Sequence, residues 1–326
     1  MASLLTKRYV ATACTKFTPL VESYKTLRHI HFPGITSFEQ GQAIQNTVVQ
    51  ANLDFKKMES KIRKQQREMA GKGLVINEYE DELLSKILAM KPMPTVLTFE
   101  FENVYTGGKK MKQDPLMHQR IHQFEALGCK YHQLERGGQV TWHGAGQLVA
   151  YVVMDLKLVR NLSVKCFVDS VLLRAVENLL AKNYALDTFS SENPGVWLAR
   201  DDLKVASVGC NIQRGITSYG VGLNVRPDLK YLNTFEMCGL QRRATSIEEQ
   251  LRIREKVSEE VSEKNSGVSI SDKIASLSVK ETGDQFAKEL ARLLNITTVE
   301  HMNGEELKKS VREENVGEEN IREENV

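Results

Sequence analysis

A chain of 326 residues, 41% of them apolar, has the size and composition of a globular protein built as one large domain or two ordinary ones. The 44 Lys and Arg residues nearly balance the 42 Asp and Glu residues, so the net charge of +2 gives no long-range reason to expect a nucleic acid or an anionic membrane as the main partner. The longest apolar runs, such as 148–154, are much shorter than the roughly 20 residues of a membrane-spanning helix.

The five cysteines are an odd number and form no CxxC pair. This spacing argues against a disulfide framework and against a zinc knuckle. We therefore expect free thiols, a reducing compartment and no metal site.

The N-terminal 21 residues contain Lys7, Arg8 and Lys16 but no acidic residue, and they are rich in Ser, Thr and Ala. Organelle transit peptides have this composition, and so do disordered N-termini of cytoplasmic proteins. The pattern leaves both interpretations open for residues 1–30.

A long helix is predicted from Phe38 to about Ala70, because Ser37 and Gln40 have the spacing of a capping box and no helix-stopping glycine pair follows before Gly71 and Gly73. Its second half is dense in Lys, Arg and Gln. Such a stretch is usually a solvated face, although it also suits an acidic partner protein.

Strands and helices then alternate along one continuous stretch. From Pro94, "TVLTFEFENVYTGG" has the pattern of a strand that runs into a loop, and 148–156 is apolar enough for a central strand. Residues 163–183 have helical spacing, and two β-rich runs punctuated by glycine follow at 202–215 and 218–225. This order predicts a single α+β domain.

The C-terminal third predicts a helix, an insertion, a second helix and a tail. Ser246 and Glu249 fit another capping box, residues 255–280 have the composition of an exposed insertion, and 282–296 returns to helical spacing. The last stretch, "VREENVGEENIREENV", repeats every five residues, which matches neither a helix nor a strand. We expect a catalytic domain at 31–298 and a charged disordered tail at 299–326.

The segment "RGGQVTWHGAGQ", 136–147, has more glycine than a core strand needs. Neighbouring glycines let a ligand approach main-chain N–H groups closely, and Arg136 and His143 would add donors at the rim. A glycine-rich surface turn is the alternative. The spacing is neither GxGxxG nor GxxxxGK[ST], so neither nucleotide loop is present.

Two further segments have small residues within β-rich runs. In "KVASVG", Lys204 precedes Ala, Ser and Gly, and taken alone it has the pattern of an edge-strand lysine that discourages aggregation. In "SYGVGLNV", the glycines fit a bulge or a hairpin bend.

Cys238, in "EMCGLQRRATS", differs from the other cysteines because it lies outside any periodic run, with Arg242 and Arg243 close by. A free thiol has a pKa of about 8.5, and a neighbouring cation lowers it. Cys238 is therefore a candidate nucleophile, and a thioester on it would remain reactive enough to acylate an amine.

The four segments "RGGQVTWHGAGQLVAY", "KVASVG", "SYGVGLNV" and "CGLQRRATS", in this order, resemble the lipoyl(octanoyl) transferases. "YTGG", 105–108, also fits, and the resemblance covers roughly 95–295. It implies an α+β fold with a mixed sheet flanked by helices, like the catalytic domain of lipoate and biotin protein ligases.

The resemblance also implies the reaction and its residues. An octanoyl group would pass from acyl carrier protein to Cys238 and then to a lysine of a lipoyl domain, and Lys204 would lower the pKa of Cys238. No cofactor is expected, because the phosphopantetheine arm of the carrier delivers the acyl group. The glycine-rich segment and the two strand segments with small residues would shape the acyl site: Arg136, Gly137, Gly138, Gln139, Val140, Thr141, Trp142, His143, Ser207, Val208, Gly209, Gly220, Val221 and Gly222.

The sequence departs from the family pattern in the pocket segments. Tyr219 stands where the family has His, Gly222 where Ala is usual, and Ala145 and Met237 replace prolines. These departures leave Cys238 and Lys204 in place but bear on the wall of the pocket, and no role is carried to Tyr219.

Two alternatives remain beside the transferase. An ATP-dependent lipoate protein ligase shares the fold and the acceptor, and a non-catalytic scaffold would bind a carrier protein through the basic helix around 56–67. The implied partners are acyl carrier protein, lipoyl domains of 2-oxoacid dehydrogenases and the glycine cleavage H protein, and the enzyme is expected to be a monomer. The family's setting, with the basic N-terminus and the long insertions, favours a mitochondrial, fungal-type member.

Overall fold

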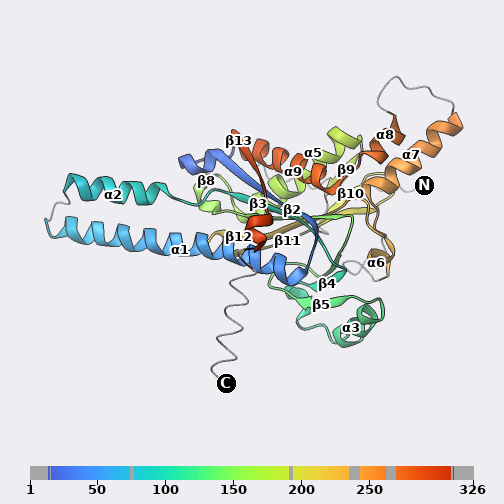
Figure 1. Cartoon of the computed structure of the whole chain (residues 1–326), viewed down its shortest axis with the longest axis horizontal. Coiled ribbons are helices and arrows are strands. Elements are labelled where there is room, and N and C mark those ends of the chain that lie inside the picture. Colours follow the sequence, from blue (N-terminus) through green and yellow to red (C-terminus); the bar gives the residue numbers. More distant parts are fainter. Residues whose placement is uncertain are drawn as a thin grey trace, which may run out of the picture.

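The centre of the protein is an eight-stranded mixed sheet (Figure 1). The structure is a computed structural model that describes residues 14, 16–73, 77–190, 194–234, 243–261, 269–309 and 311. The first three strands in the sheet are parallel and the others antiparallel. This arrangement confirms the predicted α+β fold. In spatial order the strands are β13 (Thr298–Asn303), β2 (Thr26–Thr36), β3 (Thr95–Phe101), β7 (Gln147–Val153), β12 (Ile216–Asn224), β11 (Lys204–Gln213), β10 (Val196–Leu198) and β9 (Thr188–Ser190).

Helices cover both faces of this sheet, because successive side chains of a strand point to opposite sides. On β7, Leu148, Ala150 and Val152 belong to the core under α5 (Arg174–Tyr184) and α9 (Val279–Leu293). Val149 and Tyr151 belong to the core on the other face, with Phe38 and Ile44 of α1 (Phe38–Gly71). A strand that is apolar on both sides is therefore buried on both sides, as its sequence predicts.

The predicted helices at 38–70 and 163–183 are confirmed. The Oγ of Ser37 accepts the N–H of Gln40 at the start of α1. The second helix begins as α4 (Val164–Cys166), continues as a π-helical segment at Phe167–Leu173 (η4), and ends as α5.

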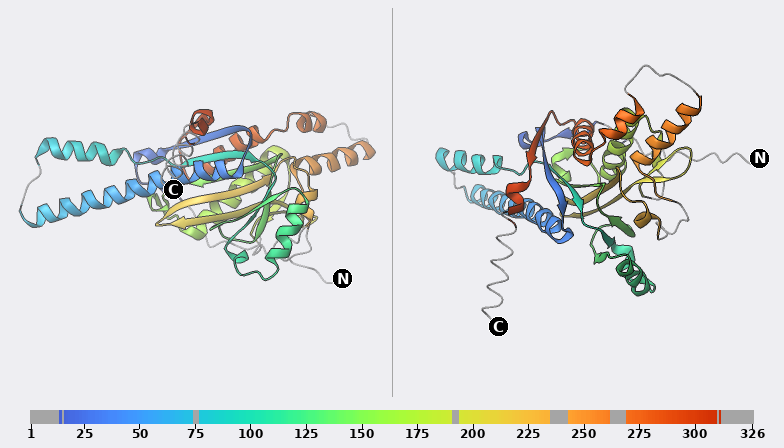
Figure 2. Two further views of the ribbon diagram at one scale, coloured as in Figure 1. Left: turned by 60° about the horizontal axis from the view of Figure 1, so that its bottom comes forward. Right: turned by 45° about the vertical axis from the view of Figure 1, so that its right-hand side comes forward.

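Helix α2 (Glu78–Ala89) was not predicted, and it lies beside the polar half of α1. Figures 1 and 2 show α2 and α1 side by side, projecting away from the sheet. An ion pair of 2.9 Å between Lys91 and Glu59 joins the two at the base of the projection. Among the described residues, none of the helices combines the length and the apolar content that crossing a bilayer requires.

A second, three-stranded sheet carries the glycine-rich segment. It consists of β5 (Lys130–Gln133), β4 (Val104–Gly107) and β6 (Val140–His143), with β4 in the middle. The short η2 (Lys109–Met111) follows β4, and α3 (Met117–Ala126) packs Phe124 against Tyr105 of β4 with ring centroids 3.9 Å apart.

The N-terminal boundary of the domain is earlier than predicted. Within residues 1–30 the chain forms β1 (Thr18–Pro19), η1 (Glu22–Lys25) and the start of β2, and Tyr24 and Leu27 are fully buried. β1 pairs with β8 (Val159–Arg160), which follows η3 (Leu156–Leu158). Residues 1–13 and 15, where a transit peptide would lie, are outside the described residues.

The C-terminal boundary was also wrong. Residues 298–303 are strand β13 of the main sheet, and 305–309 are helical, because the chain after α9 returns to pair in parallel with β2. In the predicted insertion, α7 (Ile247–Val261) continues past residue 255 and α8 (Ile270–Ala275) follows. α6 (Lys230–Asn233) precedes them. The pentad repeat from 312 onward lies outside the described residues.

The expectation of free thiols fails for two of the cysteines. Cys14 and Cys166 are joined in a disulfide between residues 152 positions apart, one before β1 and one in α4. Neither cysteine belongs to a recognisable spacing motif, so the sequence offered no signal for this pairing.

Candidate active site

The two small-residue strand segments predicted as site elements are direct neighbours in the sheet. Ser207 pairs with Gly222, Val208 with Val221 and Gly209 with Gly220, across β11 and β12. Gly220 is needed for close strand packing, because a Cβ there would lie 2.3 Å from the carbonyl oxygen of Ala150 on β7. The result is a patch of sheet with few large side chains, over which another segment of chain can lie.

The glycine-rich segment occupies that position. The N–H of Gly137 donates to the carbonyl oxygen of Cys210 on β11 over 3.0 Å, and a Cβ at Gly209 would lie 3.0 Å from the carbonyl oxygen of Gly137. Gly138 has a φ of +90°, which favours glycine. The predicted loop therefore closes over the predicted strands.

Arg136 is an internal support of this loop and not a donor at its rim, which corrects the sequence interpretation. The side chain is 7% exposed, and its guanidinium donates to the carbonyl oxygens of Gly137, Gln139 and Thr106. A guanidinium offers five N–H donors, so one buried side chain can satisfy several carbonyls that a loop would otherwise leave unpaired.

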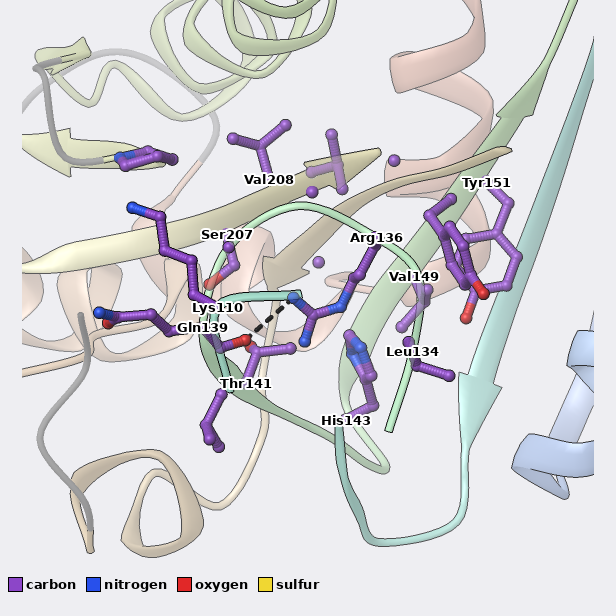
Figure 3. A pocket seen from close by; sticks show the side chains of 18 of the residues that line it. Lys110, Leu134, Arg136, Gln139, Thr141, His143, Val149, Tyr151, Ser207 and Val208 are labelled. Carbon is purple, nitrogen blue, oxygen red and sulfur yellow. Dashed lines mark hydrogen bonds between the residues drawn. The ribbon is translucent and has the colours of Figure 1, made fainter. Parts of the chain in front are cut away.

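The space between the loop and the two strands is a pocket of about 830 Å³, part of it open to solvent. Figure 3 shows the loop side chains, with Arg136 bonded to Gln139, on one side of it, and Val149 and Tyr151 on a strand opposite. Thirteen of the predicted residues line it: Arg136, Gly138, Gln139, Val140, Thr141, His143, Lys204, Ser207, Val208, Gly209, Gly220, Val221 and Gly222.

Lys204 lies in the wall of this pocket and is 4% exposed. Its strand, β11, has neighbours on both sides, so the edge-strand interpretation was wrong. Its Nζ lies 5.2 Å from the ring centroid of Trp197, and Gly195 leaves room for its chain, since a Cβ there would lie 2.5 Å from Cε of Lys204. The ammonium is held by an aromatic face beside a cavity, not extended into water.

His143 is also buried, not at the rim, and a chain of side chains fixes its orientation. Nε2 of Gln147 donates to Oδ1 of Asn224 over 2.9 Å, so Oε1 of Gln147 is left to accept from Nδ1 of His143, 2.7 Å away. Asn224 in turn donates to the carbonyl oxygen of Thr245. Burial lowers the pKa of His143 to about 4. The imidazole is therefore neutral at physiological pH, with its Nε2 lone pair available as an acceptor.

Comparison with known proteins decides the family of this site. The model of the lipoyl protein ligase A/B catalytic domain matches residues 74–264. The mitochondrial octanoyltransferase of Saccharomyces cerevisiae is 38% identical over 314 residues, which are 90% of this chain and 89% of that protein. The chain belongs to the octanoyltransferase family. It is therefore an enzyme of the acyltransferase class.

Further relatives agree with that placement. The mitochondrial octanoyltransferase of Kluyveromyces lactis is 36% identical over 317 residues, 91% of this chain and 89% of that protein. A candidate lipoate protein ligase from T. acidophilum, solved with bound lipoic acid, superposes with a TM-score of 0.51 at 13% identity, covering 89% of this chain and 93% of that one. The latter likeness supports the fold alone.

Of the described residues predicted for the octanoyltransferase site, two do not line the pocket. Side chains alternate along β6, so Thr141 and His143 face the cavity while Trp142 points away and stacks on Tyr231 with ring centroids 5.2 Å apart. Gly137 contributes its main chain to the contact with β11 and is absent from the lining.

Six lining residues were missed: Lys110, Leu134, Val149, Tyr151, Pro194 and Tyr219. Val149 and Tyr151 could have been found, because they lie on the same face of the strand predicted at 148–156. In the structure Tyr151 pairs with Gly220, one of the predicted site residues. Tyr219 stands at the family's His position and has a φ of +60°, with its N–H donated to Oε1 of buried Gln45 over 2.6 Å. That bond comes from a helix 174 residues away in the sequence and has no local signal.

The nucleophile predicted for this octanoyltransferase, Cys238, lies outside the described residues. Among the described cysteines, Cys14 and Cys166 are bonded to each other. Burial raises the pKa of the Cys210 thiol to about 11 and also raises that of Cys129. Neither of these two thiols has the environment of an activated nucleophile.

Proposed function

We propose that this enzyme transfers an octanoyl group from acyl carrier protein to a lysine of lipoyl domains, through a thioester on Cys238. The observation that carries the proposal is the position of Lys204 in the pocket wall, with its main chain bonded to the chain that follows Cys238. The N–H of Lys204 donates to the carbonyl oxygen of Arg243 over 3.0 Å, and the N–H of Thr245 donates to the carbonyl oxygen of Lys204. Four residues of chain lie between Cys238 and Arg243.

The walls of the pocket suit an acyl chain. Leu134, Val149, Val208 and Val221 are apolar, and the Tyr151 ring closes the strand side. Glycines at 220 and 222 keep the sheet bare beneath them. Apolar walls with a few polar groups at one end are typical of a site that binds a hydrocarbon chain through burial and orients it through a head group.

In the proposed first half-reaction, the thiolate of Cys238 attacks the thioester carbonyl of the octanoyl carrier. A new C–S bond forms, the old one breaks, and the phosphopantetheine sulfur leaves as a thiol after taking a proton. The Lys204 ammonium would stabilise the Cys238 thiolate and supply that proton.

In the second half-reaction, the neutral amine of the acceptor lysine attacks the enzyme thioester. The C–N bond forms, the C–S bond breaks, and Lys204 would accept the proton released by the amine. Because one thioester is exchanged for another and an amide is then formed, the reaction needs no ATP and no other cofactor. Cys238 leaves as the thiolate, paired with the Lys204 ammonium, which is the state in which the cycle began.

The remaining cysteines support the assignment of the nucleophile by their environments. Burial raises the pKa of the two free thiols among the described residues, and the other two described cysteines form a disulfide with each other. Cys238 is the cysteine left, and it is followed by two arginines that would favour its thiolate.

The partners follow from the same proposal. Exposed Lys57, Lys61 and Arg67 on α1 offer positive charge to an acidic carrier protein. The acceptors would be lipoyl domains of 2-oxoacid dehydrogenases and the glycine cleavage H protein, and the enzyme would act as a monomer. We place it in mitochondria, because two relatives of 38% and 36% identity are named mitochondrial.

The decisive experiment is an intact-mass measurement after incubation with octanoyl-acyl carrier protein. The wild type is expected to gain one octanoyl group, and Cys238→Ala to gain none. Cys210→Ala is the matched control and should be acylated like the wild type, because the thiol of Cys210 has a raised pKa. Addition of apo lipoyl domain should discharge the adduct and leave one octanoyl-lysine.

Two results would overturn the proposal. Full activity of Cys238→Ala with ATP and free lipoate would identify a lipoate protein ligase. Tight binding of the carrier protein with no adduct on the wild type, and no octanoyl-lysine on the acceptor, would leave a non-catalytic scaffold.

A further inference from the structure

A cluster of two histidines and an aspartate lies away from the pocket, at the β13 side of the sheet. His29 is on β2, His301 on β13 and Asp284 on α9, and the two histidines are register partners on neighbouring strands. Figure 1 shows these three elements together. The two histidines are 272 residues apart and form no sequence motif, so a metal site was not expected here.

The three side chains point their ligand atoms at one another. Nδ1 of His29 and Nδ1 of His301 are 2.9 Å apart, and Oδ1 of Asp284 lies 3.3 Å from the first and 3.2 Å from the second. Ligand atoms bonded at about 2.0–2.1 Å to a tetrahedral zinc ion lie about 3.3 Å from each other. The triangle therefore has nearly the dimensions of one face of such a site.

We propose that His29, Asp284 and His301 bind a zinc-type divalent transition metal ion that joins β2, α9 and β13. Two imidazole nitrogens and one carboxylate oxygen make a ligand set common in zinc sites with one open position. Because His301 is 39% exposed at its side chain, that position would face solvent and be filled by water.

The surroundings orient the ligands. Nε2 of His29 lies 2.8 Å from Oγ1 of Thr98, and Nδ1 of His31 lies 3.1 Å from the same oxygen. If the Nε2–H of His29 donates to Thr98, whose hydroxyl donates to His31, each atom is used once and the Nδ1 of His29 is left with its lone pair. A hydrogen bond on the far nitrogen of a ligating histidine is a usual feature of metal sites.

A lysine fixes the carboxylate of this cluster. Lys280 binds Oδ2 of Asp284 over 2.9 Å and leaves Oδ1 directed at the histidines.

A cluster without an ion is the competing explanation. One proton between the two Nδ1 atoms would account for the 2.9 Å distance, with His301 donating to His29. The two explanations predict different results when metal is added. A proton-bridged histidine pair should not bind the ion, whereas three converging lone pairs should bind it.

The test uses the full chain, treated with a chelator and titrated with Zn²⁺ alone and, separately, with Co²⁺. The wild type should bind one equivalent, with the visible bands of tetrahedral Co²⁺ and no sulfur charge-transfer band, and zinc should raise its Tm. Asp284→Asn, which keeps the side-chain size, and His301→Ala, at a partly exposed position, should each weaken zinc binding by more than about tenfold.

The matched control is His122→Ala, which removes a surface histidine whose ring centroid is 4.6 Å from that of His118 on α3. It should bind zinc as the wild type does. Equal Tm values of the metal-free variants and the metal-free wild type would show that folding is intact. The proposal is wrong if the wild type binds no zinc, or if Asp284→Asn and His301→Ala bind it as tightly as the wild type. Because these residues lie apart from the pocket, either result leaves the acyl-transfer proposal unaffected.

Discussion

Lys204 and Arg243 are joined through their main chains, with the N–H of Lys204 donating to the carbonyl oxygen of Arg243 over 3.0 Å. An isolated parallel bridge between Lys204 and Ala244 extends this pairing. Residues 243–245, which follow Cys238 in the sequence, therefore lie beside the buried lysine. Lys204 and Arg243 are 39 residues apart in the sequence, and the fold brings them to the separation of one hydrogen-bonded strand pair.

Replacement of this lysine should therefore impair acylation without unfolding the sheet. We expect Lys204→Met to slow the formation of the octanoyl adduct by about 10²–10⁴-fold, the usual contribution of one positioned proton-transfer group. Rapid-quench sampling followed by intact-mass spectrometry, with octanoyl-acyl carrier protein as the donor, measures this rate. Lys112→Met, at an exposed position paired with Glu135, is the control and should react at the wild-type rate. An unchanged rate in Lys204→Met would remove Lys204 from the proposed mechanism.

A second prediction separates two glycines of the same strand. A Cβ at Gly220 would lie 2.3 Å from the carbonyl oxygen of Ala150, which is rigid backbone, whereas a Cβ at Gly222 would meet only side-chain atoms of Gln147 and His143, at 3.2 and 3.4 Å. Gly220→Ala should lower the free energy of unfolding by about 1–3 kcal/mol, as overpacking does. Gly222→Ala, the usual family residue, should be tolerated and should narrow the pocket.

Urea unfolding of both variants checks the first half of this prediction. Competition between octanoyl and longer acyl carriers checks the second, since the narrowed pocket should lose activity toward the longer chain first. Equal stability losses in the two variants would contradict the assignment of these contacts.

How far the sequence predicts this protein depends on whether the determining contacts are local. The central strand at 147–153 and the helix from Phe38 follow from apolar runs and from the Ser37 cap, and both were predicted. The strand β13 was missed, because "TVEHMN" has no apolar alternation and becomes a strand only by pairing with β2. Helix α2 buries none of its residues and was missed, although Asn77 and Glu80 form a capping box at its start.

The same distinction applies to the site. Glycine spacing located the loop and both strands, because main-chain approach requires glycine at those positions. The roles of Arg136 and His143 were misjudged. A sequence shows that a polar side chain is present, but burial depends on segments that arrive from elsewhere: β4 for Arg136, and Gln147 with Asn224 for His143.

The depressed pKa of His143 predicts a pH dependence of stability. The native imidazole takes up a proton only near pH 4, whereas the unfolded one does so near pH 6.5, so the unfolded state binds more protons between these values and stability falls as the pH is lowered through this window. The full difference corresponds to about 3 kcal/mol, using about 1.36 kcal/mol for each pKa unit.

This contribution is isolated by a comparison of variants, because His29 and His31 also have lowered pKa values. His143→Gln should reduce the change in unfolding free energy between pH 7.5 and pH 4.5, measured by urea denaturation. His118→Gln, a histidine in contact with another on α3 but with no buried network, should leave that change as in the wild type. If His143→Gln and the wild type lose stability equally on acidification, His143 is not a buried neutral imidazole.

The last prediction concerns Gln45, which supports the wall of the pocket from helix α1. Its Oε1 accepts the N–H of Tyr219 over 2.6 Å, and Tyr219 has a φ of +60°, a conformation that costs energy for any residue with a Cβ. The Tyr219 ring lines the pocket and meets Tyr151 edge to face, with centroids 5.7 Å apart. The Gln45 amide therefore holds a strained residue in the position where it shapes the acyl site.

Gln45→Ala leaves the N–H of Tyr219 buried without this acceptor and should cost about 1–3 kcal/mol of unfolding free energy. Gln45→Glu keeps an acceptor of the same length and should restore much of the geometry. Gln50→Ala, an exposed position on the same helix, should cost less than about 0.5 kcal/mol. Tyr219 shapes the pocket wall, whereas Lys204, the proposed proton-transfer group, lies on a different strand. Gln45→Ala should therefore raise KM for the acyl carrier more than it lowers kcat. A fall in kcat alone, with KM unchanged, would show that Gln45 acts on the chemical step and not through the pocket wall.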